Sequence, residues 1–102
     1  MVGNVTAYSD IRLKTDIEVI ENAGEKLATL RGVNFTRKSD GSRGTGLIAQ
    51  EVQEVLPEAV LEASDGTLSL AYGNMVGLLV EAIKELQAEV KELRAQVQTL
   101  SK

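Results

Sequence analysis

The strongest pattern in this sequence is an alternation of three- and four-residue spacings between apolar side chains in the last quarter of the chain. In a heptad lettered a to g, such spacing places apolar residues at a and d, and here isoleucine or valine occupies a and leucine occupies d. The pattern predicts that residues 76–102 form a helix that associates with copies of itself as a coiled coil. The residues of this seam are Val76, Leu79, Ile83, Leu86, Val90, Leu93, Val97 and Leu100.

A competing interpretation is an amphipathic helix packed on its own domain. The apolar stripe is narrow, and from Lys84 onward the residues between its a and d positions are polar or alanine, which favours the coiled coil. Glu89 at g and Arg94 at the following e can pair between parallel chains. The choice of a and d residues favours two strands, whereas Leu78 and Val80, which lie off the seam, suit a thicker bundle at the helix start.

A short helix is predicted over residues 21–32. Asn22 is a suitable N-cap, and Glu25 three residues later completes a capping-box pattern. Gly32 is placed to end the helix. The apolar face of this helix is Ala23, Leu27 and Leu30.

Three stretches lack a helical period. From Ile11 to Ile17, apolar residues and a threonine alternate with charged residues, which is typical of a short strand or an extended entry to a domain. Residues 33–38 are rich in β-branched and aromatic side chains and predict a strand. Residues 39–46 contain three glycines and no apolar side chain, and therefore predict a loop.

The middle of the chain predicts a helix followed by a hairpin. Apolar residues recur at helical spacing from Ile48 to Leu56, and Pro57 ends the segment. The turn signal "SDG" at residues 64–66 separates two short runs of β-type residues. Together these elements predict an α+β fold, in which a small globular part with short helices and strands precedes a long C-terminal helix.

Composition narrows the chemistry. Aromatic residues make up only 3% of the 102 residues, so the core of a monomer is marginal and oligomerisation is expected. The absence of histidine and cysteine excludes disulfides, histidine-based catalysis and Cys/His zinc sites, and no metal or cofactor is predicted. A net charge of −4 argues against a nucleic-acid partner. No apolar run approaches the ~20 residues that span a membrane.

The remaining candidate chemistry lies in "AYSDIRLKTDI", residues 7–17. Ser9 is a candidate nucleophile and Lys14 a candidate base, because a lysine that is held neutral can accept the proton of a serine. In a strand the two residues would lie roughly 16 Å apart, and on a helix about 140° apart around the axis. A turn after Asp10 or a contact between chains is needed to join them. Otherwise Ser9 or Asp10 caps a turn and Lys14 is a surface charge.

Three blocks of the sequence, in order and with short spacers, resemble the C-terminal intramolecular chaperone domain of bacteriophage tailspikes and tail fibres. The endosialidase tailspikes are its best-known members, and a related domain occurs in myelin regulatory factor. The blocks are "SDIRLKTDIEVIENAGEKLATLRGVNFTRK", "GLIAQEVQEVLPEAV" and "LAYGNMVGLLVEAIKEL".

The resemblance implies a homotrimer that assists the folding of an upstream triple-stranded β-helix and then cuts itself off with a serine–lysine dyad. Ser9 matches the nucleophile, Lys14 the base and Asp10 the acidic neighbour. The implied trimer replaces the two-strand preference of the seam. A virion-associated precursor is implied, made in the host cytoplasm, with the chaperone released from the mature fibre. The implied division is 1–8 as the remnant of the upstream passenger, 9–75 as the globular chaperone region and 76–102 as the coiled coil.

Ring size indicates which bond a serine attacks within its own chain. Attack by Ser9 on its own carbonyl closes a strained four-membered ring, whereas attack on the Tyr8 carbonyl closes a five-membered ring. We therefore expect cleavage at Tyr8–Ser9, through an ester that water hydrolyses. Cleavage at Ser9–Asp10 would need the serine of another chain. Two alternatives are a trimerisation cap that does not cleave and a coiled-coil scaffold for an unrelated partner.

Overall fold

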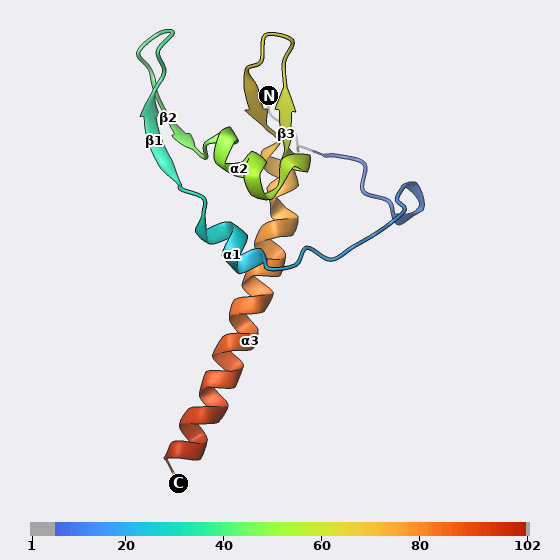
Figure 1. The fold of residues 1–102 in the computed structure, drawn as a ribbon, viewed down its shortest axis with the longest axis vertical. Helices are drawn as coiled ribbons and strands as arrows, with labels where there is room; N and C mark the ends of the chain where they lie inside the picture. Colours follow the sequence, from blue (N-terminus) through green and yellow to red (C-terminus); the bar gives the residue numbers. More distant parts are fainter. Residues whose placement is uncertain (1–5, 102) are drawn as a thin grey trace.

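The computed structural model describes residues 6–101, and Figure 1 shows a group of short elements at one end of a long helix. The α+β class with a long C-terminal helix is thereby confirmed, while the association of that helix with other copies stays a prediction. The elements are η1 (Ile11–Leu13), α1 (Ala23–Ala28), β1 (Val33–Thr36), β2 (Arg43–Gly46), α2 (Ala49–Val55), η2 (Pro57–Ala59), β3 (Val60–Glu62), β4 (Leu68–Leu70), η3 (Tyr72–Met75) and α3 (Val76–Leu100), where η marks a 3-10 helix.

The four strands form two separate antiparallel hairpins, β1–β2 and β3–β4. In Figure 1 both hairpins project beyond the N-terminal end of α3. The β3–β4 hairpin confirms the turn predicted at residues 64–66, where the Asp65 carboxylate accepts a hydrogen bond from the Thr67 N–H at 2.9 Å. Gly66 has a φ of 88°, a left-handed conformation that glycine adopts at little cost.

The predicted loop over residues 39–46 is wrong in its second half, which forms strand β2. Glycine is a poor strand residue, but Gly44 lies opposite Phe35 in the hairpin. A Cβ atom at Gly44 would come within 2.7 Å of the Phe35 ring. The absence of a side chain therefore lets the ring lie against the backbone of β2, and cross-strand packing outweighs the low strand propensity.

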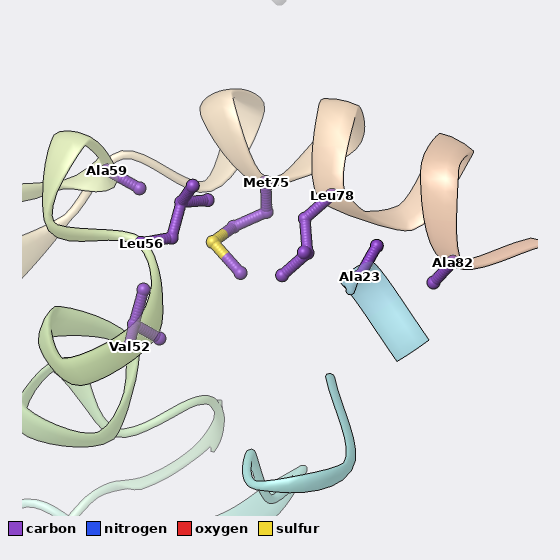
Figure 2. Packing of buried hydrophobic residues seen from close by; sticks show 7 residues of the cluster. All are labelled: Ala23, Val52, Leu56, Ala59, Met75, Leu78 and Ala82. Atoms are coloured by element: carbon purple, nitrogen blue, oxygen red, sulfur yellow. The ribbon is translucent and has the colours of Figure 1, made fainter. Parts of the chain in front are cut away.

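The buried core gathers along one side of the first turns of α3 (Figure 2). Leu78 and Val52 are its largest fully buried side chains. Leu78 packs into the core of its own chain, so the thicker bundle inferred from it is not needed to explain it. The predicted helix before Pro57 is confirmed as α2, and Leu56 just after α2 also lies in the core. The core residues are Ala23, Val52, Leu56, Ala59, Met75, Leu78 and Ala82.

One predicted boundary and one predicted strand are wrong. Helix α1 ends at Ala28, before Gly32, because the Thr29 N–H bonds back to carbonyls of the last turn. Of the two forms predicted for Ile11 to Ile17, a short strand or an extended entry, the strand is wrong: the segment begins with the 3-10 turn η1 and continues as irregular chain. Neither hairpin pairs with this segment, and an alternating pattern forms a strand only when a neighbouring strand supplies hydrogen-bond partners.

The start of α1 differs from the predicted capping box. Asn22 has a left-handed conformation, with a φ of 54°, and its side chain makes no capping hydrogen bond. Instead the Glu85 carboxylate, on α3, accepts hydrogen bonds from the backbone N–H groups of Ala23 and Gly24, both at 2.8 Å. The cap of α1 thus comes from a residue 62 positions downstream of Ala23, and it ties α1 to α3.

The Glu85 cap predicts a pH-dependent stability. Hydrogen bonds from the Gly24 and then the Ala23 N–H lower the pKa of Glu85 below its ordinary value of 4.5. A group with a lowered folded-state pKa stabilises the fold above its unfolded pKa, and this stability is lost as the pH falls through the folded pKa. We expect Glu85→Gln to lower stability at neutral pH and to weaken the further loss on acidification.

Urea unfolding followed by circular dichroism at neutral and acidic pH measures both effects. Glu92→Gln, an exposed residue on the same helix, is the matched control and should leave the unfolding midpoint unchanged. Equal midpoints for the two variants at neutral pH would mean that the cap contributes nothing to stability.

Candidate functional site

The candidate dyad lies on an N-terminal arm, residues 6–19, that reaches away from the rest of the chain (Figure 1). Among the described residues, none before Ile20 belongs to the buried core or packs against it. The arm is therefore positioned by its own local structure, and its side chains face solvent.

The structure brings Ser9 and Lys14 together. The Lys14 Nζ donates a hydrogen bond to the Ser9 Oγ at 2.9 Å, which is within the range expected of a nucleophile and its base. Both residues are exposed. Neither the strand nor the helix geometry considered for the sequence would have allowed this contact, so the backbone between the two residues must turn.

The turn that joins them is η1, directly after Asp10, which is the first of the two ways in which the sequence allowed the contact. The Asp10 carboxylate caps it by accepting a hydrogen bond from the Arg12 N–H at 2.9 Å. Backbone bonds from the Leu13 N–H to the Asp10 carbonyl, at 3.0 Å, and from the Lys14 N–H to the Ile11 carbonyl, at 3.1 Å, close the turn. The compact turn shortens the path between residues 9 and 14 and lets the lysine reach back to the serine.

Arg12 is a member of this site that the sequence reasoning missed. Its guanidinium forms an ion pair with Asp10, with Nη2 at 2.7 Å from Oδ2, and Nε donates to both carboxylate oxygens at 3.1 Å. The side chain and then the N–H of Arg12 lower the pKa of Asp10, and Asp10 raises the pKa of Arg12. An acidic N-cap followed two residues later by arginine is a local signal that would have pointed to this clamp.

The Asp10–Arg12 pair also restricts the chemistry. Because its carboxylate is held by Arg12, Asp10 is a poor candidate for the base that takes the serine proton. Lys14 remains as that base, and its Nζ donates a hydrogen bond to the Ser9 Oγ from a site that is open to solvent. Burial favours the neutral form of a lysine. In the single chain, Ser9 and Lys14 are therefore close enough to react, but Lys14 is not buried.

The seam of α3 forms a second candidate site, for association. Each of its residues is exposed, from 39% for Val90 to 83% for Leu100. The first turns of α3 use a different face for the chain's own core, through Leu78 and Ala82. The seam is thus an apolar stripe that runs the length of α3 and stays at least 39% exposed at every position.

Other kinds of site find no support in the part of the chain that the structure describes. Residues 6–101 contain no cluster of three or more histidine, cysteine, aspartate or glutamate side chains able to hold a metal ion. Among the described helices, none combines the length and the apolar character that crossing a membrane requires.

The chain combines an α+β module, a serine–lysine contact on its entry arm and a long helix with an exposed heptad seam. These features are the ones expected from the resemblance to phage chaperone domains. A peptidase family model described as "Chaperone of endosialidase" matches residues 9–61, from Ser9 into β3. This match covers more than half of the chain, and the chain belongs to that family. The family expected from the three sequence blocks is thereby confirmed.

The chain is also similar to two phage tail fibre proteins and an animal protein. It is 41% identical over 104 residues to the long tail fiber protein Gp37 of Enterobacteria phage K3, covering 92% of this chain and 8% of that protein. It is 42% identical over 94 residues to the Gp37 of Escherichia phage AR1, covering 82% and 8%. It is 37% identical over 98 residues to myelin regulatory factor homolog 1 of Caenorhabditis elegans, covering 84% and 10%. The chain thus spans a small part of each relative's length.

Proposed function

We propose that this chain is an intramolecular chaperone that trimerises through α3 and assists the folding of an upstream triple β-helix of a phage fibre or tailspike. It then releases itself by serine–lysine autoproteolysis at the Tyr8–Ser9 bond. The observation that carries the proposal is the contact of 2.9 Å between the Lys14 Nζ and the Ser9 Oγ. Membership of the endosialidase chaperone family and similarity to tail fibre proteins support it.

In this proposal, the coiled coil acts first. Association through the seam holds three copies of the upstream passenger close together, which raises their effective concentration for one another. A three-chain β structure depends on contacts between separate chains, so such gathering lowers the entropic cost of starting it. Residues 1–8 then belong to the passenger, residues 9–75 to the chaperone region and residues 76–102 to the coiled coil.

Self-cleavage follows as an acyl shift. Neutral Lys14 takes the proton of the Ser9 hydroxyl, and the Ser9 Oγ attacks the carbonyl carbon of Tyr8. The Tyr8–Ser9 C–N bond breaks, Lys14 returns its proton to the Ser9 nitrogen, and an ester joins the two residues. One water molecule then hydrolyses the ester, leaving a carboxylate on Tyr8 and restoring the hydroxyl of Ser9.

The same scheme places the protein in the virion-associated precursor of a fibre, made in the host cytoplasm, with the chaperone released from the mature fibre. Similarity to tail fibre proteins supports this location. A trimerisation cap of a phage fibre that does not cleave is the second candidate function. The exposure of Ser9 and Lys14 favours it, because no described residue of the single chain shields the pair from water.

The test uses a precursor in which the passenger precedes this chain. We expect denaturing gels to show two pieces, and mass spectrometry to show that the C-terminal piece begins at Ser9. A C-terminal piece that begins at Asp10 would reject attack within the chain at Tyr8–Ser9. A folded trimeric precursor that stays in one piece would reject self-cleavage and support the trimerisation cap that does not cleave.

A further inference from the structure

We propose that the reactive site of each copy is completed by a second copy, because the N-terminal arm of one chain docks into an apolar hollow of its neighbour. The inference rests on the proposed function, since it takes association through α3 as given. It adds the place where the dyad becomes buried and the chemical nature of the surface that buries it.

The arm carries an apolar surface that its own chain leaves uncovered. Its four aliphatic residues from Ile11 to Val19 are each at least 64% exposed, although the arm is otherwise polar and charged. Burying large aliphatic side chains is favourable, so four of them within nine residues give the arm apolar area to bury against another molecule. These residues are Ile11, Leu13, Ile17 and Val19.

The receiving surface is an apolar hollow of about 430 Å³ between the end of α1, the segment after β2 and the start of α3. Leucine side chains line most of it, among them Leu30 and Leu47. The Tyr72 hydroxyl accepts a hydrogen bond from the Leu47 N–H at 2.9 Å and so fixes one wall. A Cβ atom at Gly46 would come within 2.3 Å of that hydroxyl, so the wall depends on glycine at this position.

The location of the hollow indicates that the occupant is another copy. Leu79 lines the hollow and is also a seam residue, so association through the seam brings a neighbouring chain to the edge of the hollow. In Figure 1 the arm leaves one flank of α3, while α1 and the β1–β2 hairpin lie on the other flank. Two complementary surfaces on opposite flanks make a head-to-tail contact, which closes into a ring when the rotation between copies allows.

Docking would act directly on the reactive pair. Ile11 and Leu13 belong to η1, the turn that joins Ser9 to Lys14. If these side chains enter the hollow, Lys14 moves from water toward an apolar surface, which favours its neutral form. Cleavage would then depend on assembly, because the arm of a single chain has no neighbouring hollow in which to bury Lys14.

Cysteine cross-linking tests this contact without relying on cleavage. The chain has no cysteine of its own, so any disulfide must join the introduced cysteines. Chains carrying Leu13→Cys in the arm and chains carrying Leu30→Cys in the hollow are co-expressed with different tags and oxidised. We expect a disulfide-linked pair that contains both tags. A disulfide requires Cα atoms within about 7 Å of each other, so random contacts do not mimic the result.

The control pairs Leu13→Cys with Leu61→Cys, a leucine on strand β3 that at 62% exposed is more open to random contact than the partly buried Leu30. This pair is expected to stay unlinked. A chain that carries both Leu13→Cys and Leu30→Cys and links only within itself would overturn the inference, because the arm would then dock on its own body. Trimers by light scattering that form no disulfide would overturn the inference and keep the proposed trimer. Monomers would overturn both.

Discussion

Ser9→Ala should leave the precursor as a single uncut chain, with a loss of self-cleavage of about 10⁴-fold or more. The substitution removes the oxygen that Lys14 contacts and with it the only group placed to attack the Tyr8 carbonyl in the proposed mechanism. Lys14→Ala is expected to have the same effect, since a serine hydroxyl is a weak nucleophile without a base. Denaturing gels of the precursor, followed over time, measure both losses.

Lys14→Arg separates the role of the base from that of the charge. Arginine keeps the positive charge and a donor for Ser9, but its guanidinium does not lose a proton in proteins. We therefore expect this variant to fold and to remain uncut. Ser39→Ala, an exposed serine in the β1–β2 hairpin, is the control and should be cut normally. Normal cutting of Lys14→Arg would show that Lys14 only supports the turn.

Ile83→Lys combined with Val90→Lys should convert the proposed trimer into monomers of 11.0 kDa. Both are a positions of the seam, 56% and 39% exposed in the single chain. Burying an aliphatic side chain contributes about 1.5–3 kcal/mol, and this gain is repeated in every copy. The substitution removes it and places like charges side by side along the axis. Analytical ultracentrifugation of the variant measures the mass directly.

Val80→Lys is the matched control for the seam. It makes the same type of change on the same helix at a residue of similar exposure, 46%, that lies off the seam. We expect it to keep the trimer. A trimer that persists in the Ile83→Lys and Val90→Lys variant would mean that α3 does not associate through the seam. Normal self-cleavage by a monomeric seam variant would contradict completion of the site by a second copy.

Local rules account for the parts of the fold that were predicted correctly. Proline lacks the N–H that a helix needs, so α2 stops before Pro57. Glycine at residue 66 permits the turn between β3 and β4. The serine–lysine contact was partly predictable for the same reason. Residue types indicated the two members, their spacing called for a turn after Asp10 or a contact between chains, and the Asp10–Arg12 clamp that forms the turn is local.

The sequence by itself determined the class of fold and the long C-terminal helix with its heptad stripe, because each depends on spacing along short stretches. The two candidate reactive residues came from residue types and from the resemblance of the three sequence blocks, since a spacing of five alone leaves them apart. The tertiary structure decided three further features. Glu85 rather than Asn22 caps α1, Phe35 lies on Gly44 and makes β2 a strand, and Leu78 turns inward while the seam stays exposed. These features depend on contacts across a hairpin or between residues some 60 positions apart. Such contacts produce no regular spacing of residues from which they could be predicted.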